Sequence, residues 1–294
     1  MKVELSKQSS GDFQASVVVY TGPWRVLAGV LRTAAHGSLV VLLGVFFFDP
    51  DAFPTNPLKQ IRLFSSLFLA PEFAAWLLAR AFSARAVVSN GMLTIDQRER
   101  SIEIPLDAIV GVEPWKLPAP RSGVSLRLRS GRLLPQGLAT ADAVGLVEAM
   151  VAGGASESSR DGLQSFAARY ACARLANPAT WLENPIVKFV VYSLVPTVPA
   201  FRLNQWIVYG GTFGEYYTYG LKAYLLGFAL WWASWTFCVV LLAAGLRLVV
   251  EVVTIFFAAL LPGSAASARR VAEWSQRLLY YGGIPTVLML RFMQ

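Results

Sequence analysis

The sequence predicts a helical membrane protein of about five spans, with one small antiparallel β domain between its second and third spans. Several apolar runs approach the roughly 20 residues that a helix needs to cross the hydrocarbon core. Charged residues make up only 15% of the chain, whereas soluble domains carry about 25%. The polar stretch between the second and third runs alternates apolar and polar residues, as strands do.

The first two apolar runs, at about 27–48 and 61–82, form a predicted helical hairpin. The first run ends at Asp49-Pro50-Asp51, because two carboxylates and a proline do not continue a helix in lipid. The segment before the hairpin has no apolar core directly after its first basic residue, which argues against a cleaved signal peptide. We therefore assign residues 1–82 to an N-terminal segment and a transmembrane hairpin.

Residues 83–154 have the pattern of a small β domain. Short β-branched runs are separated by turn dipeptides, Asn90-Gly91 and Ser130-Gly131. The segment 124–129 alternates apolar and polar residues, which predicts a strand with one solvated face. Thr140 is the expected N-cap of a helix that reaches about Ala152. We expect an antiparallel sheet whose open side is closed by this final helix.

Three segments of this region resemble a bacterial pleckstrin-homology-like (PH-like) domain. They are residues 90–96 (NGMLTID), 102–109 (IEIPLDAI) and 126–131 (LRLRSG). The resemblance implies two packed sheets with a C-terminal helix, in a domain type often attached to membrane helices. It implies no particular activity, because that fold hosts many roles.

Residues 155–184 form a predicted linker, followed by a C-terminal transmembrane region over 185–294. Within the linker, the segment 162–177 is expected to form either a helix on the membrane surface or a helix packed on protein. The third span is expected at about 185–202, with Pro196 and Pro199 interrupting its second half.

The fourth span begins near Ala223, and its apolar character continues to Leu261. It is either one long helix or a helix broken near Gly245. The last apolar stretch, 278–293, crosses the membrane, re-enters it or lies flat. The sequence therefore leaves between four and six spans open.

The distribution of basic residues predicts the orientation. Arginines are frequent between the second and third spans, whereas the loops near 49–60 and 203–221 contain few basic residues apart from Lys59. By the positive-inside rule, the N-terminus and the β domain lie in the cytoplasm of a bacterium, and the spans lie in its inner membrane. The net charge of +8 is spread over short segments rather than gathered on one face, so no nucleic-acid partner is expected.

Polar residues inside the apolar runs are the first candidates for function. Arg32 and His36 are four residues apart on the first span and share a helix face. Glu72 lies in the second span, where an ion pair with Arg32 would neutralise both charges. Arg247 and Glu251 are also four apart, near the end of the fourth span, where an interfacial ion pair is the simpler interpretation.

Cofactor and catalytic signals are missing from the sequence. His36 is the only histidine, which excludes a haem held by two histidines and a histidine-rich metal site within this chain. Cys172 and Cys238 have no metal-ligand spacing and form no disulfide framework. No phosphate-binding loop or nucleophile elbow is present. We expect no cofactor, no metal and no assigned catalytic residue.

Three arginines, Arg127, Arg129 and Arg132, cluster around a predicted hairpin of the β domain. They are candidates for binding anionic lipid headgroups or a partner, since each basic residue near such a surface contributes about 1 kcal/mol. The solvated face of a strand is the competing interpretation.

These observations lead to one main functional hypothesis and two rivals. The main hypothesis is an inner-membrane accessory or scaffold subunit of a larger complex, whose PH-like domain docks a cytoplasmic partner or an anionic lipid surface. Its expected partners are membrane lipids and other membrane subunits. The alternative is a transporter or lipid-handling protein that uses Glu72 and the interrupted helices. A membrane-embedded enzyme has the least support.

Overall fold

The computed structural model describes residues 13–49, 51–54, 56–98, 100–115, 122–175 and 180–293. The chain divides into two compact units. The first contains the described residues among 1–33, 71–177 and 254–269, and the second contains the rest. The expected cytoplasmic position of the N-terminus concerns residues outside the described part.

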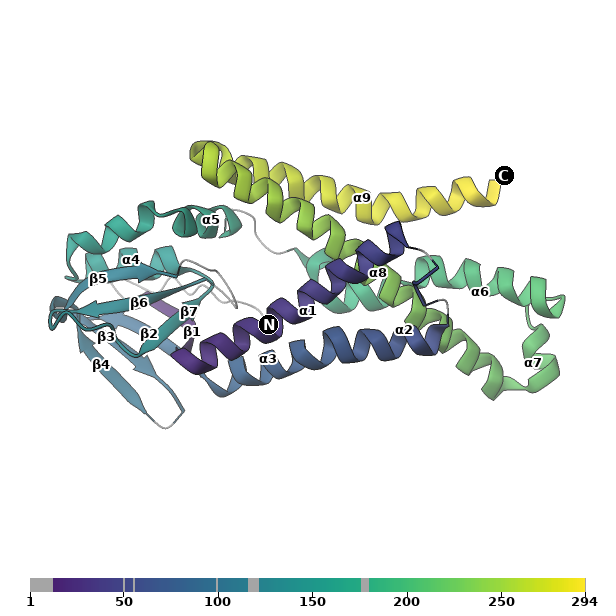
Figure 1. Ribbon diagram of the computed structural model, residues 1–294, viewed down its shortest axis with the longest axis horizontal. Coiled ribbons are helices and arrows are strands. Elements are labelled where there is room, and N and C mark those ends of the chain that lie inside the picture. Colours follow the sequence, from purple (N-terminus) through teal and green to yellow (C-terminus); the bar gives the residue numbers. More distant parts are fainter. Residues whose placement is uncertain are drawn as a thin grey trace. The chain divides into compact units, whose positions relative to one another are not determined.

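The first unit is built on a curled, seven-stranded antiparallel sheet that forms a half-barrel (Figure 1). Its strand order is β4-β3-β2-β1-β7-β6-β5. The antiparallel β domain expected from the sequence is therefore confirmed. The strands are β1 (Phe13–Thr21), β2 (Ser83–Ser89), β3 (Met92–Asp96), β4 (Ser101–Pro105), β5 (Ile109–Pro114), β6 (Gly123–Leu128) and β7 (Gln136–Thr140).

The central strand β1 lies in the N-terminal segment that precedes the predicted hairpin, where no strand was expected. β1 pairs with β2 on one side and with β7 on the other. The sheet therefore extends beyond the predicted boundaries 83–154. Two predicted spans are inserted between the neighbouring strands β1 and β2.

One face of the sheet packs on helix α4 (Ala143–Ala152), which closes the open side as expected. Leu146, Val147 and Met150 of this helix are fully buried against the strands. The helix N-cap is Asp142, whose Oδ1 accepts the N–H of Gly145 at 2.7 Å. The predicted cap, Thr140, is instead the last residue of β7, so that expectation was wrong by two residues.

Four helices of the described residues are long and apolar enough to cross a membrane, against the expected five or so. The second and third of them each contain a short π-helical segment, η1 or η5. The four are α1 (Gly22–Phe48); α2, η1 and α3 (Pro57–Phe64, Ser65–Leu69 and Ala70–Ala81); η5 and α6 (Ile186–Val191 and Leu194–Tyr209); and α8 (Leu221–Leu260).

Helix α8 continues through Gly245 without a break. The expected alternative of a break there is therefore wrong, because one glycine within a long apolar helix costs only about 1 kcal/mol. The last apolar stretch belongs to a helix, α9 (Ala265–Met293), which is not among the four candidate spans. A short helix, α7 (Gly214–Tyr219), lies between α6 and α8.

The predicted linker contains a 3₁₀ segment, η3 (Glu157–Gln164), and helix α5 (Phe166–Leu175). Tyr170 and Ala173 of α5 are buried in a cluster with Ala258 and Ala265. This contact favours the interpretation of α5 as a helix packed on protein over a helix on the membrane surface.

Candidate functional site

The sheet and the transmembrane hairpin are joined without a linker. β1 ends at Thr21, and α1 begins at the next residue (Figure 1). On the return path α3 ends at Ala81, and only Phe82 lies between it and the first residue of β2. The N–H of Val19 donates to the carbonyl of Phe82 at 2.9 Å, which closes the ladder at this point. An antiparallel strand pair thus continues directly into the two ends of the hairpin.

The membrane-proximal half of β1 is buried on both faces, which explains its run of apolar residues. Val17 and Val19 belong to the core under α4, whereas Val18 and Tyr20 belong to a second cluster. That cluster includes Ala28 of α1 and partly buried residues at the end of α3. Burying a valine side chain contributes roughly 1.5–3 kcal/mol, so this joint resists bending.

Trp115 lies at the centre of the second cluster and is only 4% exposed. Two glycines make room for its indole: a Cβ at Gly123 would lie 2.9 Å from the ring, and one at Gly137 would lie 2.5 Å from it. The Arg25 guanidinium of α1 lies 3.8 Å from the ring centroid. This cation–π contact fastens the first turn of α1 to the sheet, and it is worth about 0.5–2 kcal/mol.

The ion pair predicted between Arg32 and Glu72 is present, with 3.6 Å between Arg32 Nε and Glu72 Oε1. At 1.5 Å per residue, Arg32 lies about 15 Å from the start of α1 and Glu72 about 14 Å from the end of α3. Both residues therefore lie well inside candidate spans, where a charge without a partner is costly. Glu72 Oε2 is buried and accepts no hydrogen bond from the described residues.

His36 is the other polar residue predicted on the face of α1 that carries Arg32. It lies one turn further along α1, and its ring packs edge-to-face on Phe68 at 5.9 Å. Among the described residues, no group of three or more His, Cys, Asp or Glu side chains is placed to hold a metal ion.

Arg247 and Glu251 form the predicted ion pair on α8, at 2.8 Å between Nη2 and Oε1. Arg247 Nη1 also lies 3.5 Å from Oε1 of Glu273 on α9, a contact that spacing within α8 does not reveal. The Arg247 side chain is 42% exposed, so each pair contributes at most about 1 kcal/mol. The contact of Arg247 with Glu273 therefore links α8 to α9.

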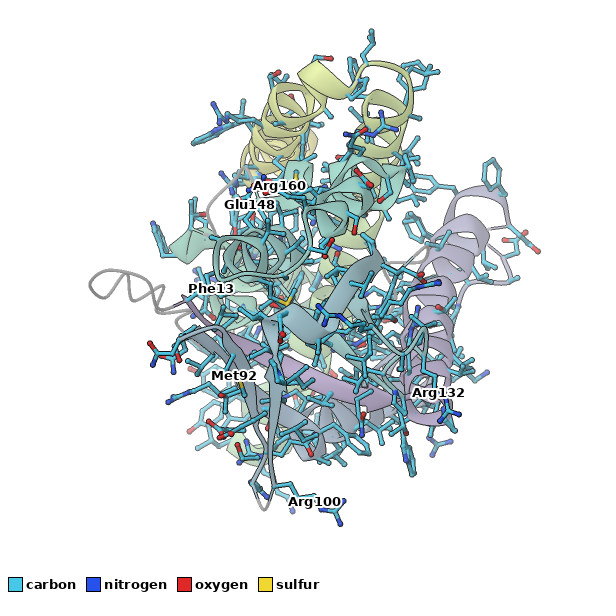
Figure 2. All side chains as sticks on the ribbon, turned by 90° about the vertical axis from the view of Figure 1, so that its left-hand side faces the viewer. Phe13, Met92, Arg100, Arg132, Glu148 and Arg160 are labelled. Carbon is cyan, nitrogen blue, oxygen red and sulfur yellow. The ribbon has the colours of Figure 1, made fainter. Side chains whose placement is uncertain are left out.

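The arginines of the β6–β7 region differ in their partners. Arg127 Nε donates to Glu113 of β5 at 3.0 Å, and Arg129 Nη2 donates to the carbonyl of Asp107 at 3.0 Å. Arg132 is exposed next to the turn at Gly131 (Figure 2). The pairing of Arg127 with a carboxylate favours the interpretation of this strand face as a solvated surface.

A second ionic cluster, which the sequence did not predict, lies where the third candidate span begins. Glu183 accepts from Lys188 Nζ at 2.8 Å and from Arg277 Nε at 3.2 Å. Burial raises the pKa of Glu183, but hydrogen bonds and charge from the two cations lower it by more. The net pKa of this carboxyl is therefore below its ordinary value. Arg277 is 94 residues away from Glu183 in the sequence, so it gives no local signal for this cluster.

Three tyrosines bind the same two segments together. Tyr280 donates to the carbonyl of Lys188 at 2.5 Å, and Tyr281 donates to the carbonyl of Leu182 at 2.6 Å. In the opposite direction, the Tyr192 hydroxyl lies 2.8 Å from the carbonyl oxygen of Tyr281. These bonds hold α9 against the start of the third candidate span.

A carbonyl of the π-helical segment η5 has a side-chain partner on α8. Trp232 Nε1 of α8 donates to the carbonyl of Val190 at 3.0 Å and lies 2.9 Å from Ser193 Oγ. Ser193 Oγ also lies 2.9 Å from Thr236 Oγ1. π-helical segments are rare overall but are often found at functional sites. The polar cluster of Trp232, Ser193 and Thr236 is therefore a candidate for function.

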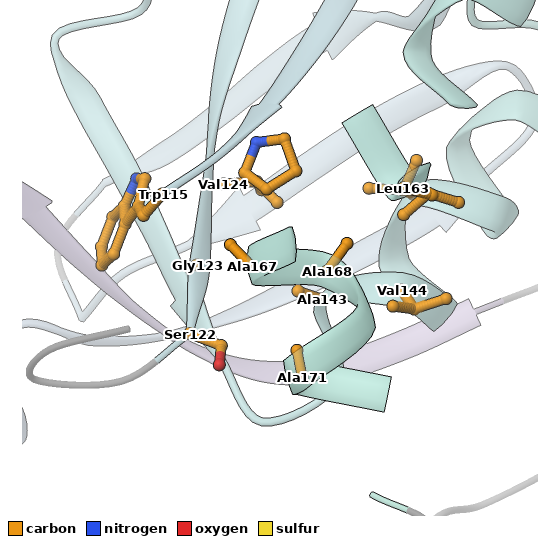
Figure 3. Close-up of a pocket in the computed structure, with 12 residues that line it drawn as sticks. Trp115, Ser122, Gly123, Val124, Ala143, Val144, Leu163, Ala167, Ala168 and Ala171 are labelled. Carbon is orange, nitrogen blue, oxygen red and sulfur yellow. The ribbon is translucent and has the colours of Figure 1, made fainter. Parts of the chain in front are cut away.

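Two small apolar cavities accompany these features. The first, in the sheet unit, has a volume of about 10 Å³ between Trp115 and helices α4 and α5 (Figure 3). The second has about 70 Å³ and is lined by Leu43, Phe46, Phe47, Cys238, Leu241 and Leu242. Ligand pockets commonly have about 300–1,000 Å³, so neither cavity accommodates a molecule of that class as it stands.

Comparisons of the chain with protein-family models, curated proteins and solved structures found no match. The function must therefore be argued from the features described above.

Proposed function

We propose that this membrane-embedded chain is an accessory or scaffold subunit of a bacterial inner-membrane complex, and that its PH-like sheet domain docks a cytoplasmic partner or an anionic lipid surface. The continuous joint between the sheet and the hairpin carries this proposal. A partner bound to the sheet would lie next to the first turns of α1 and the end of α3, which pack on the sheet without an intervening linker. That is the property a scaffold needs.

The outer face of strands β1 to β4 supports a docking role. Opposite the buried face, Arg85, Asp96 and Glu103 are exposed in a polar surface of mixed charge. Mixed charge gives specificity and orientation to a protein partner, since complementary potentials suppress wrong pairings. The arginine-rich composition between the second and third spans supports a cytoplasmic position for this surface.

The test is gentle extraction from the native membrane, followed by native-gel mobility and mass spectrometry. We expect a protein partner at a fixed ratio, and we expect Asp96→Lys with Glu103→Lys to remove it. Glu157→Lys with Asp161→Lys is the matched control, because both residues are also exposed but lie on η3. A chain that migrates alone in its native membrane extract would contradict the proposal.

A specific observation favours transport or lipid handling as the second candidate. The Arg32–Glu72 pair lies within two candidate spans, and two candidate spans contain π-helical segments. Interrupted helices and intramembrane charges often line substrate paths. Uptake by the chain in proteoliposomes, abolished by Glu72→Gln but retained in Glu251→Gln, would favour this function over a scaffold.

A further inference from the structure

The cluster at the start of the third candidate span carries unbalanced positive charge. Lys188 and Arg277 share one carboxylate, Glu183, which leaves a net charge of about +1. The Lys188 and Arg277 side chains are only 10% and 8% exposed. No other acidic side chain of the described residues pairs with either cation. Burying excess charge is costly unless an anion compensates it, so the cluster favours a further anion.

The two cations retain the hydrogen-bonding capacity to hold such an anion. Glu183 engages one of the three N–H groups of the Lys188 ammonium and one of the five of the Arg277 guanidinium. Aromatic rings stabilise both cations from the side: Arg277 lies 5.1 Å from the Trp274 ring, and Lys188 lies 5.5 Å from the Tyr280 ring. Arginine and lysine together are a common phosphate-binding set.

The position of the cluster identifies the source of the anion. Glu183 precedes the candidate span that begins at Ile186, so the cluster lies where the chain enters the bilayer. Trp181 and Trp274 beside it are 72% and 53% exposed, as expected of rings that favour the headgroup level. The anions concentrated at that level are lipid phosphates.

We propose that the phosphate of an anionic lipid headgroup binds Lys188 and Arg277 and completes the charge balance of this cluster. The inference rests on the membrane placement of the chain within the proposed function, and not on its partner-docking role. The lipid bridges the start of the third candidate span and α9, beside the tyrosine bonds that already join them.

The test uses the full chain in nanodiscs of phosphatidylcholine, with or without phosphatidylglycerol. We expect phosphatidylglycerol to raise the unfolding temperature of the wild type, and native mass spectrometry to show retained phosphatidylglycerol. Lys188→Gln with Arg277→Gln should abolish both effects. The matched control, Arg98→Gln with Arg100→Gln, removes the same charge from exposed positions and should preserve both.

Glu183→Gln gives a result of opposite sign. Removing the competing carboxylate leaves both cations to the lipid, so the variant should retain more phosphatidylglycerol and depend on it more strongly. A role in packing alone predicts equal destabilisation of this variant in both lipid mixtures, and that result would overturn the proposal.

Two results with the wild type alone also decide the matter, even if the cation variants fail to fold. Equal stability and equal lipid retention with and without phosphatidylglycerol would overturn the proposal. So would full stabilisation by inorganic phosphate added to phosphatidylcholine nanodiscs, because it would assign the site to free phosphate. Partner co-purification is a separate measurement, so its failure does not affect these outcomes.

Discussion

The Tyr192 hydroxyl donates to the carbonyl of Tyr281, which Pro285 leaves without its helical donor. In an α-helix that carbonyl would accept from the N–H four residues later, and proline has none. The Tyr192 hydroxyl, which comes from the third candidate span, therefore replaces the missing backbone donor in α9. This contact also explains how α9 tolerates a proline in its interior.

Tyr192→Phe should lower the free energy of unfolding by about 1–3 kcal/mol, because it leaves the Tyr281 carbonyl unsatisfied. The measurement is thermal or detergent-induced unfolding of the purified chain. Tyr217→Phe is the matched control, because the Tyr217 side chain is 80% exposed. Equal stability of the two variants would show that another group, or water, satisfies the carbonyl.

The second candidate span contains the same arrangement. Pro71 follows Leu67 by four residues, and Ser38 Oγ lies 3.1 Å from the Leu67 carbonyl oxygen and 2.8 Å from that of Ala35, so the two carbonyls share its hydrogen. Ser38→Ala should destabilise the wild type by about 1 kcal/mol but should be nearly neutral in a Pro71→Ala background, where a backbone N–H is restored. A double-mutant cycle with no coupling between the two positions would refute this account.

The joint between α1 and the sheet predicts a strong effect at a glycine. Gly137→Ala should cost about 1–3 kcal/mol, because its Cβ would lie 2.5 Å from the Trp115 ring. Gly44→Ala within α1 is the control, since nothing lies within 4 Å of its Cβ position. Intrinsic tryptophan fluorescence during unfolding measures both, and a neutral Gly137 variant would mean that the indole has room to shift.

Glu183 predicts a dependence of stability on pH. Since its folded pKa lies below the ordinary value, the ionised carboxylate stabilises the folded state above the unfolded pKa of about 4.3. That stabilisation is lost as the pH falls through the folded pKa. The difference in unfolding temperature between the wild type and Glu183→Gln should therefore shrink on acidification. A difference that stays constant from neutral to acidic pH would assign it to shape alone.

Local pattern was enough to predict the elements whose signals are local. Apolar runs predicted the four candidate spans, and Asn90-Gly91 predicted a hairpin turn whose residues adopt positive φ. The pairs Arg32–Glu72 and Arg247–Glu251 also followed from helix spacing and the cost of charge in lipid.

Contacts between distant segments were not predictable from the sequence. β1 was missed because only its first half alternates, while Val17–Tyr20 is buried on both faces and reads as a continuous apolar run. The cluster of Glu183 with Arg277 was missed for a related reason. Each residue alone looks like an ordinary interfacial charge, and only the packing of α9 brings them together.

The insertion of the hairpin between β1 and β2 constrains how the chain is made. β1 leaves the ribosome before both spans, and its two neighbours, β2 and β7, are synthesised after them. The sheet can close only when an even number of spans crosses the membrane, because the chain then returns to the side on which β1 lies. A failure of either span to insert would leave β1 across the membrane from its partners. Completion of the sheet therefore requires that both spans insert or that neither does, and it fails when only one inserts.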